Sequence, residues 1–133
     1  MEITKMIIFD TNFLIDLVRF KVDLEEVEGL VARPYQLATL DAVVSELKKI
    51  GNKNARAALK IIEGRGFKIL KAAKRNVDDA IIDAVEKAVK ENNAEQAART
   101  VVATNDAELR KRIKALGAKV IYLRAKKHLE IIN

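Results

Sequence analysis

The sequence predicts an α/β fold with three layers, in which helices cover both faces of a mainly parallel, five-stranded sheet. Short β-prone runs alternate with longer amphipathic stretches along the chain, as in right-handed strand–helix–strand units. The first run, MIIF at residues 6–9, is wholly apolar, as expected for a strand that is covered on both faces. Residues 1–133 are therefore expected to form one domain.

The individual elements follow from the spacing of apolar residues and from the breaks between them. In chain order they are a strand at 6–9, helices at 13–18 and 23–32, a strand at 35–38, helices at 39–50 and 54–63, a strand at 67–70, a helix at 76–89, a polar linker at 91–99, a strand at 100–103, a helix at 107–116 and a strand at 119–123. Pro34 ends the second helix because the residue before a proline is pushed out of the α region. Gly51 and Asn52 separate the third helix from the fourth. The apolar side chains of residues 129–132 are expected to pack on the domain or on a second subunit.

The composition narrows the possible chemistry. The absence of cysteine excludes disulfides, thiolate catalysis and cysteine zinc sites. A single histidine, His128, removes most chemistry that relies on imidazole. The sequence has no secretory signal and no apolar run of about 18 residues. A cytoplasmic protein without a membrane partner is therefore expected.

The charges are segregated along the chain, which carries a net charge of +6. Residues 46–75 contain 10 basic and 2 acidic side chains, and residues 100–133 contain 8 and 3. A single run of this kind is usually a solvated helix face, but two runs favour a polyanion such as RNA as the partner. The residues expected to bind nucleic acid are Lys48, Lys49, Lys53, Arg56, Arg110, Lys111 and Arg112.

Two strands end in similar polar sequences. MIIFDTN at residues 6–12 and TVVATND at residues 100–106 each place an aspartate just after a strand. If these strands are neighbours at a switch point of the sheet, Asp10 and Asp106 face each other across a crevice at the strand ends. Asp10 could instead serve only as a helix cap. We expect the capping role to fall to Thr11 and Asn12, which are good cap residues.

Glu46 borders the apolar face of its predicted helix. A carboxylate in that position is unusual unless it has a partner or a metal. A surface ion pair with Lys49 or Lys53 would also explain it.

Three further acids crowd the start of the helix at residues 76–89. Asn76 or Asp78 is expected to cap this helix, and acids near a helix N-terminus are stabilised by the helix dipole. Asp79 and Asp83 lie four residues apart on one side, where like charges repel unless a cation lies between them.

Asp10, Glu46, Asp79 and Asp106 therefore form a candidate carboxylate site. Ligands that offer only oxygen select a hard cation, here Mg²⁺ or Mn²⁺ as one or two ions. Such an ion can polarise a phosphoryl oxygen and activate water. An acidic metal site with a basic rim suits a phosphodiester backbone.

The segments FDTN around Asp10, SEL around Glu46, VDDAII around Asp79 and VATND around Asp106 occur in the order found in PIN-domain proteins, which the chain resembles over nearly its full length. The resemblance implies a strand order of 3-2-1-4-5, a metal-dependent ribonuclease and a homodimer. It implies that the four acids are catalytic metal ligands.

The resemblance also implies that Asn12 and Thr104 orient the acids. The third acid is best matched by Asp79, which precedes a small and two apolar residues. Asp78 and Asp83 remain alternatives.

The biological role is open between two kinds of PIN-domain protein. One is an RNA-processing enzyme of the archaeal and eukaryotic ribosome-processing type, which would act with a ribosomal-precursor assembly. The other is a VapC-type toxin with an antitoxin partner. A non-catalytic RNA-binding module that keeps the fold is the alternative from another class. A phospho-acceptor signalling domain is disfavoured because Arg124, not a lysine, follows the last predicted strand.

Overall fold

The computed structural model describes residues 5–73, 76–125 and 128–132, and for residues 89–98 it describes the backbone alone. Within these residues a six-stranded sheet has the order β3-β2-β1-β4-β5-β6. In chain order the elements are β1 (Lys5–Phe9), α1 (Thr11–Arg19), α2 (Leu24–Glu28), β2 (Tyr35–Leu40), α3 (Asp41–Ile50), α4 (Lys53–Gly64), β3 (Lys68–Leu70), α5 (Val77–Arg99), β4 (Thr100–Ala103), α6 (Ala107–Ala115), β5 (Lys119–Arg124) and β6 (His128–Ile132). The predicted α/β class and the predicted order of the first five strands are confirmed.

Strand β1 lies in the middle of the sheet. It pairs in parallel with β2 on one side and with β4 on the other. Strands β2 and β3 follow on the first side, and β4 and β5 follow on the second. The direction of the chain across the sheet therefore reverses at β1, and such a switch point leaves a crevice at the carboxyl ends of the strands. Asp10 and residues 104–106 leave the sheet at this edge.

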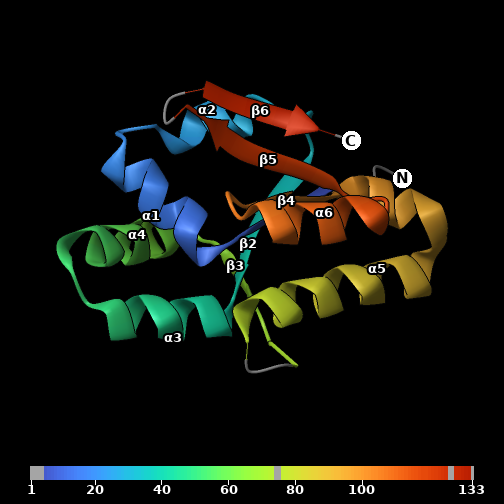
Figure 1. Cartoon of the computed structure of the whole chain (residues 1–133), viewed down its shortest axis with the longest axis horizontal. Helices are drawn as coiled ribbons and strands as arrows, with labels where there is room; N and C mark the ends of the chain where they lie inside the picture. The colour runs from blue at the N-terminus through green and yellow to red at the C-terminus, as the bar shows by residue number, and fades with distance from the viewer. Residues whose placement is uncertain (1–4, 74–75, 126–127, 133) are drawn as a thin grey trace.

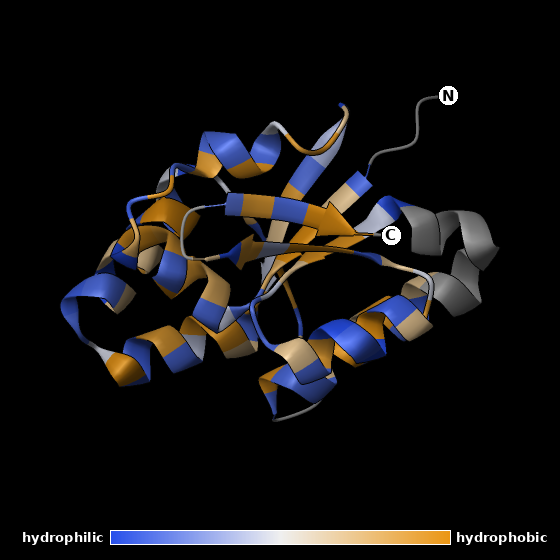
Figure 2. Ribbon diagram, turned by 45° about the horizontal axis from the view of Figure 1, so that its top comes forward, coloured by the Kyte–Doolittle hydropathy of each residue, from blue (hydrophilic) through white to orange (hydrophobic). Residues whose placement is uncertain are grey.

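Two groups of helices pack around the sheet. Helices α1, α3 and α4 contact one another, and α5 contacts α6, the strands β1, β2, β4 and β5, and also α3. Figure 1 shows the first group on one side of the molecule and the pair α5 and α6 on the other. The central strands are largely hydrophobic, while the helices alternate between hydrophobic and hydrophilic positions (Figure 2). None of the helices in the described part of the chain is both long and apolar enough to span a membrane.

The core fixes the end of β1. Ile7, Ile8 and Phe9 are at most 2% exposed. The ring of Phe9 lies 5.8 Å from the ring of Phe13 and 5.1 Å from that of Phe67, both in tilted geometry, which aromatic pairs favour. Burying a side chain of this size contributes about 1.5–3 kcal/mol. The backbone just before Asp10 is therefore held by the core on both sides.

Three predicted boundaries are wrong. Helix α5 continues through residues 91–99, which the sequence predicts as a polar linker. These residues contain no glycine or proline and include several good helix formers, so nothing interrupts the helix. Strand β2 extends to Leu40, so α3 begins at Asp41 and the buried Thr39 belongs to the sheet. Helix α2 spans only Leu24–Glu28, not residues 23–32.

The sixth strand accounts for the apolar tail. Strand β6 pairs antiparallel with β5, with Ile131 opposite Ile121. The hydroxyl of Tyr122 donates a 2.8 Å hydrogen bond to Glu130 across this pair, and Arg124 forms a 3.0 Å ion pair with the same carboxylate. Of the two expected locations for the tail, the structure therefore gives packing on the domain.

Gly51 ends α3 at its connection to α4. Its φ is +62°, a left-handed conformation that ends α3 and lets its amide donate to the carbonyl of Leu47 at 3.1 Å. We predict that Gly51→Ala lowers the free energy of unfolding by about 1–2 kcal/mol, because a Cβ is strained in this conformation. Urea denaturation measures the change.

The matched control is Gly64→Ala at the end of α4. An added Cβ there meets nothing within 4 Å, and the backbone is not left-handed. The free energy of unfolding should stay the same or rise by up to about 1 kcal/mol. Equal effects of the two substitutions would contradict the assignment of strain to Gly51.

Candidate functional site

Neighbouring strands hold the chain where it leaves β1. The amide of Asp10 donates a 2.9 Å hydrogen bond to the carbonyl of Ala103 at the end of β4. From the other side, the hydroxyl of Thr39 donates a 2.7 Å hydrogen bond to the carbonyl of Phe9. Strands β2 and β4 thus fix the backbone on which the carboxylate of Asp10 is mounted.

Asp10 is 3% exposed, and both oxygens of its carboxylate accept hydrogen bonds. Oδ1 accepts from the amide of Thr11, and Oδ2 accepts from the hydroxyl of Thr104, both at 2.8 Å. Asp10 is itself the N-cap of α1, so the prediction that Thr11 and Asn12 take over the capping role is wrong. The geometry of the strand end makes Asp10 both a cap and a candidate site residue.

Thr11 and Asn12 lie differently from each other. Thr11 is buried, and its hydroxyl has no hydrogen-bond partner among the described residues. Asn12, which the resemblance assigns to orienting the acids, is exposed and makes no side-chain hydrogen bond to any of them within the described part of the chain.

Thr104 joins the two strand ends. While its hydroxyl donates to Asp10, the same oxygen accepts a 3.2 Å hydrogen bond from the amide of Asp106. The carboxylate of Asp106 caps α6 by accepting from the amide of Leu109 at 3.0 Å. The structure therefore brings Asp10, Thr104 and Asp106 together at the switch point.

Burial and neighbouring acids oppose the ionisation of Asp10. Its pKa is raised from 3.8 to about 6, chiefly by burial and further by the negative charges of Asp78 and Glu46. The hydrogen bonds from Thr104 and from the Thr11 amide favour the charged form but do not compensate. A buried carboxylate among other carboxylates is stabilised by any cation that joins them.

Asp78 belongs to the same group of charges. Its pKa is raised by partial burial first and then by the charges of Asp106, Asp79 and Glu46, while Arg112 lowers it. Asp78 thus interacts with Glu46 and with both strand-end acids, since its charge also raises the pKa of Asp10.

Asp79 and Asp83, the other acids of this helix, have basic partners. Oδ1 of Asp79 lies 3.3 Å from Nη2 of Arg112, and the Asp79 side chain is 55% exposed. Oδ2 of Asp83 lies 3.3 Å from Nζ of Lys87 in the next turn. Asn76 caps the helix by accepting from the amide of Asp79 at 3.3 Å, as one of the two expected caps. The surroundings of the three acids therefore favour Asp78 as the third acid of the group.

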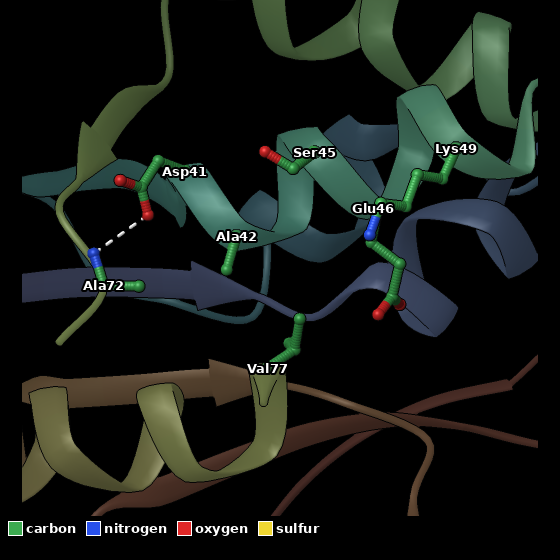
Figure 3. A pocket seen from close by; sticks show the side chains of 7 residues that line it. All are labelled: Asp41, Ala42, Ser45, Glu46, Lys49, Ala72 and Val77. Carbon is green, nitrogen blue, oxygen red and sulfur yellow. Dashed lines mark hydrogen bonds between the residues drawn. The ribbon is translucent and has the colours of Figure 1, made fainter. Parts of the chain in front are cut away.

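Glu46 is exposed on α3 and lines a cleft of about 450 Å³. Figure 3 shows Glu46 and Lys49 at one end of this cleft and Asp41 and Ala72 at the other. The Glu46 carboxylate extends from α3 toward the start of α5, where Val77 precedes Asp78 (Figure 3). This orientation agrees with the electrostatic effect of Glu46 on Asp10 and Asp78.

The basic residues fall into two groups. Lys48, Lys49, Lys53 and Arg56 are exposed around the junction of α3 and α4, and Arg56 donates to the carbonyl of Gly51 at 2.9 Å.

The second group lies in the first two turns of α6. Lys111 is exposed, and Arg112 is held by Asp79. The guanidinium of Arg110 lies 4.2 Å from the centre of the Tyr122 ring, in a cation–π contact.

With this geometry in place, similarity to known proteins decides the family. A family model described as a PIN-like domain matches residues 7–126 of the 133. The chain belongs to the PIN-like domain family. The predicted resemblance is confirmed.

Two relatives of this PIN-like chain cover nearly its whole length. It is similar to ribonuclease VapC4 of Methanocaldococcus jannaschii, with 26% identity over 135 residues that span 96% of each chain. It is similar to the structure of the PIN domain endonuclease Utp24, with a TM-score of 0.75, 28% identity, and coverage of 95% of this chain and 90% of the other.

A third comparison concerns the fold alone. VapBC2 from Rickettsia felis, solved with a DNA fragment from its promoter, matches with a TM-score of 0.53 and 18% identity over 90% of this chain and 99% of the other.

The PIN-like site is not a ready-made metal cage. Among the described residues, no group of three or more aspartate, glutamate or histidine side chains is arranged to hold a metal ion directly. The acids nevertheless offer only carboxylate oxygen, and several of them interact electrostatically. Mg²⁺ commonly binds one or two carboxylates and keeps several of its waters, so the donor set fits this cation without a closed cage.

Three residues that position the site, Thr39, Asn105 and Asp16, were not predicted from the sequence. Thr39 holds the end of β1 through its hydrogen bond to Phe9. It was missed because the sequence predicts residue 39 as the start of a helix and not as part of a strand. Asn105 donates to Asp16 on α1 and accepts from the amide of Leu123 on β5, both at 2.8 Å. The available signals were the place of Asn105 between Thr104 and Asp106 and a polar Asp16 among the apolar residues of α1.

The raised pKa of Asp10 predicts a pH-dependent stability in the absence of divalent metal. Because the folded state holds the proton of Asp10 more tightly than the unfolded state, this contribution is present near pH 4 and is lost as the pH rises through about 6. The difference between 3.8 and about 6 corresponds to about 3 kcal/mol. We predict that the free energy of unfolding of the wild type, relative to that of Asp10→Asn, falls by up to this amount between pH 4 and pH 7.5.

Urea denaturation of both proteins in EDTA at several pH values measures this difference. Asparagine keeps the size of the side chain but does not titrate, so it removes the pH dependence that belongs to Asp10. Parallel pH profiles for the two proteins would contradict the raised pKa.

Proposed function

We propose that this PIN-like chain is a divalent-metal-dependent endoribonuclease, with Asp10, Glu46, Asp78 and Asp106 as the metal-holding acids. The observation that carries the proposal is the environment of Asp10, a buried carboxylate with a pKa of about 6 that Asp78 and Glu46 help to raise. Such a charge is costly to the fold unless a cation accompanies it. Similarity to proteins named ribonuclease VapC4 and endonuclease Utp24 supports the same class of reaction.

The four acids would hold Mg²⁺ or Mn²⁺. When bound, such an ion supplies the Lewis acidity and the activation of water that phosphodiester hydrolysis requires. The chain itself orients the acids. The Thr104 hydroxyl and the Thr11 amide fix the two oxygens of Asp10, and each carboxylate oxygen has a further lone pair to offer.

The basic residues would hold the RNA backbone. Lys111 on α6 and Lys48 and Lys53 near the α3–α4 junction are exposed. Contacts from such residues to phosphates do not depend on sequence and weaken steeply with salt. The RNA strand would thus be held on both sides of the acidic strand ends.

The chain could act in RNA processing or as a VapC-type toxin with an antitoxin. Both roles would use the RNA cleavage proposed for this site. These roles, and the homodimer expected from the resemblance, stay predictions. The antitoxin and the ribosomal-precursor assembly likewise stay predicted partners.

The choice of the third acid predicts a contrast between neighbouring residues. We expect Asp10→Asn and Asp78→Asn to reduce kcat by at least about 100-fold, because each removes a charge that would hold the metal. Asp79→Asn should keep kcat within a few fold, because Asp79 faces Arg112. Manganese-dependent cleavage of a labelled RNA measures all three, with circular dichroism as the control for folding.

If Asp79→Asn abolished cleavage and Asp78→Asn did not, the assignment of the third acid would be contradicted. The other acids would keep their proposed roles.

The activity itself is tested with a circular single-stranded RNA, which only an endonuclease can open. We expect cleavage with Mn²⁺, none with EDTA, and products that carry 5′-phosphate and 3′-hydroxyl ends. A 2′,3′-cyclic phosphate product, or cleavage that survives Asp10→Asn, would contradict metal-dependent hydrolysis. RNA binding without cleavage, unaffected by metal, would indicate the non-catalytic binding module instead.

A further inference from the structure

The cleft beside Glu46 has the size and position of a substrate subsite. Its volume of about 450 Å³ falls within the range of about 300–1,000 Å³ that is typical of small-molecule sites. One wall is α3, and the opposite side includes Ala72, after β3, and Val77, at the start of α5. Glu46 is the one proposed metal-holding acid that lines the cleft, and Val77, also in its lining, is the chain neighbour of Asp78.

The cleft combines an apolar surface with two available polar groups. Ala42, Ala72 and Val77 supply the apolar part, and Ser45 and Lys49 supply a hydroxyl and an ammonium group. Both polar side chains are exposed. Neither makes a hydrogen bond or an ion pair with another described residue, so both are available to a ligand.

The far end of the cleft is fixed and acidic. Oδ1 of Asp41 accepts a 2.9 Å hydrogen bond from the amide of Ala72, and Figure 3 shows this bond across the end opposite Glu46 and Lys49. The bond ties the first residue of α3 to the segment after β3. The negative charge of Asp41 disfavours a phosphate at that end of the cleft.

We propose that this cleft binds the ribonucleotide next to the scissile phosphate, an inference that rests on the proposed ribonuclease function. Lys49 contacts the phosphate of that nucleotide, and Ser45 forms a hydrogen bond with its ribose 2′-hydroxyl. The sugar and base pack against Ala42, Ala72 and Val77. A contact to the 2′-hydroxyl is what allows a protein to distinguish RNA from DNA at a given position.

The contact to Ser45 is tested by combining enzyme and substrate changes. The substrate is a short RNA with one mapped cleavage site and a single 2′-deoxy substitution beside the scissile phosphate. The loss of one hydrogen bond should lower kcat/KM of the wild type about fivefold, which corresponds to about 1 kcal/mol. Ser45→Ala should show the same loss on the all-ribose RNA and no further loss on the 2′-deoxy substrate. Losses that multiply would overturn the assignment of Ser45.

The phosphate contact is tested with Lys49→Gln. We expect KM to rise several fold, kcat to stay within twofold, and the slope of log affinity against log salt to decrease by about 1. The matched control is Lys60→Gln, since Lys60 is also exposed but lies on α4 and does not line the cleft. Equal effects of both substitutions would overturn a specific role for Lys49.

The apolar wall is tested by filling the cleft without changing its charge. Ala72→Leu should raise KM several fold, whereas Ala115→Leu on the exposed end of α6 should not. Unchanged cleavage by Ala72→Leu would place the nucleotide elsewhere.

A binding experiment separates failure of the subsite from failure of the proposed activity. In metal-free buffer, a 5′-phosphorylated ribodinucleotide should shift the NMR amide signals of Ala42, Ser45 and Ala72. Its 2′-deoxy counterpart should bind more weakly to the wild type but not to Ser45→Ala. Shifts confined to other surfaces, or no shifts, would overturn the subsite, whereas cleft binding without any RNA cleavage would overturn the ribonuclease function alone.

Discussion

The hydrogen bond from Thr104 to Asp10 is the interaction on which the site depends. It joins the ends of β4 and β1, two strands whose parallel pairing creates the switch point of the sheet. The same hydroxyl oxygen accepts a hydrogen bond from the amide of Asp106. The Thr104 side chain thus links two acids that lie 96 positions apart in the sequence. The aromatic contacts of Phe9 then hold this arrangement against the core.

The site contains carboxylates whose ionisation is opposed by their burial and by each other's charge. Burial, and to a smaller extent the charges of nearby acids, raise the pKa of Asp10 to about 6, while two hydrogen bonds stabilise its charged form. Asp78 is subject to the same kind of conflict. In a structure that only had to be stable, such carboxylates would be disfavoured. The cation that we propose for this site would resolve the conflict, and the basic residues of α3, α4 and α6 suit the polyanion that such a cation would act on.

The fold was largely predictable because apolar runs and glycine breaks are local signals. The sixth strand was missed because the conformation of so short a segment depends on its pairing with β5 and on its packing against the core. The positions of Asp10 and Asp106 followed from strand ends. The choice among Asp78, Asp79 and Asp83 could not be predicted from the sequence. It depends on how α5 packs against α6, where Arg112 forms an ion pair with Asp79. The spacing of residues in the sequence predicts which side chains share one face of a helix, but not which residues of other elements that face contacts.

The position of a bound metal is the most direct test of the proposed carboxylate site. Anomalous diffraction from crystals soaked in Mn²⁺ would locate the ion independently of any enzymatic assay. We expect a peak between the carboxylates of Asp10, Asp78 and Asp106, beside Glu46, which disappears in Asp10→Asn. A peak coordinated by Asp79 and not by Asp78, or the absence of any peak at the switch point at saturating Mn²⁺, would contradict it.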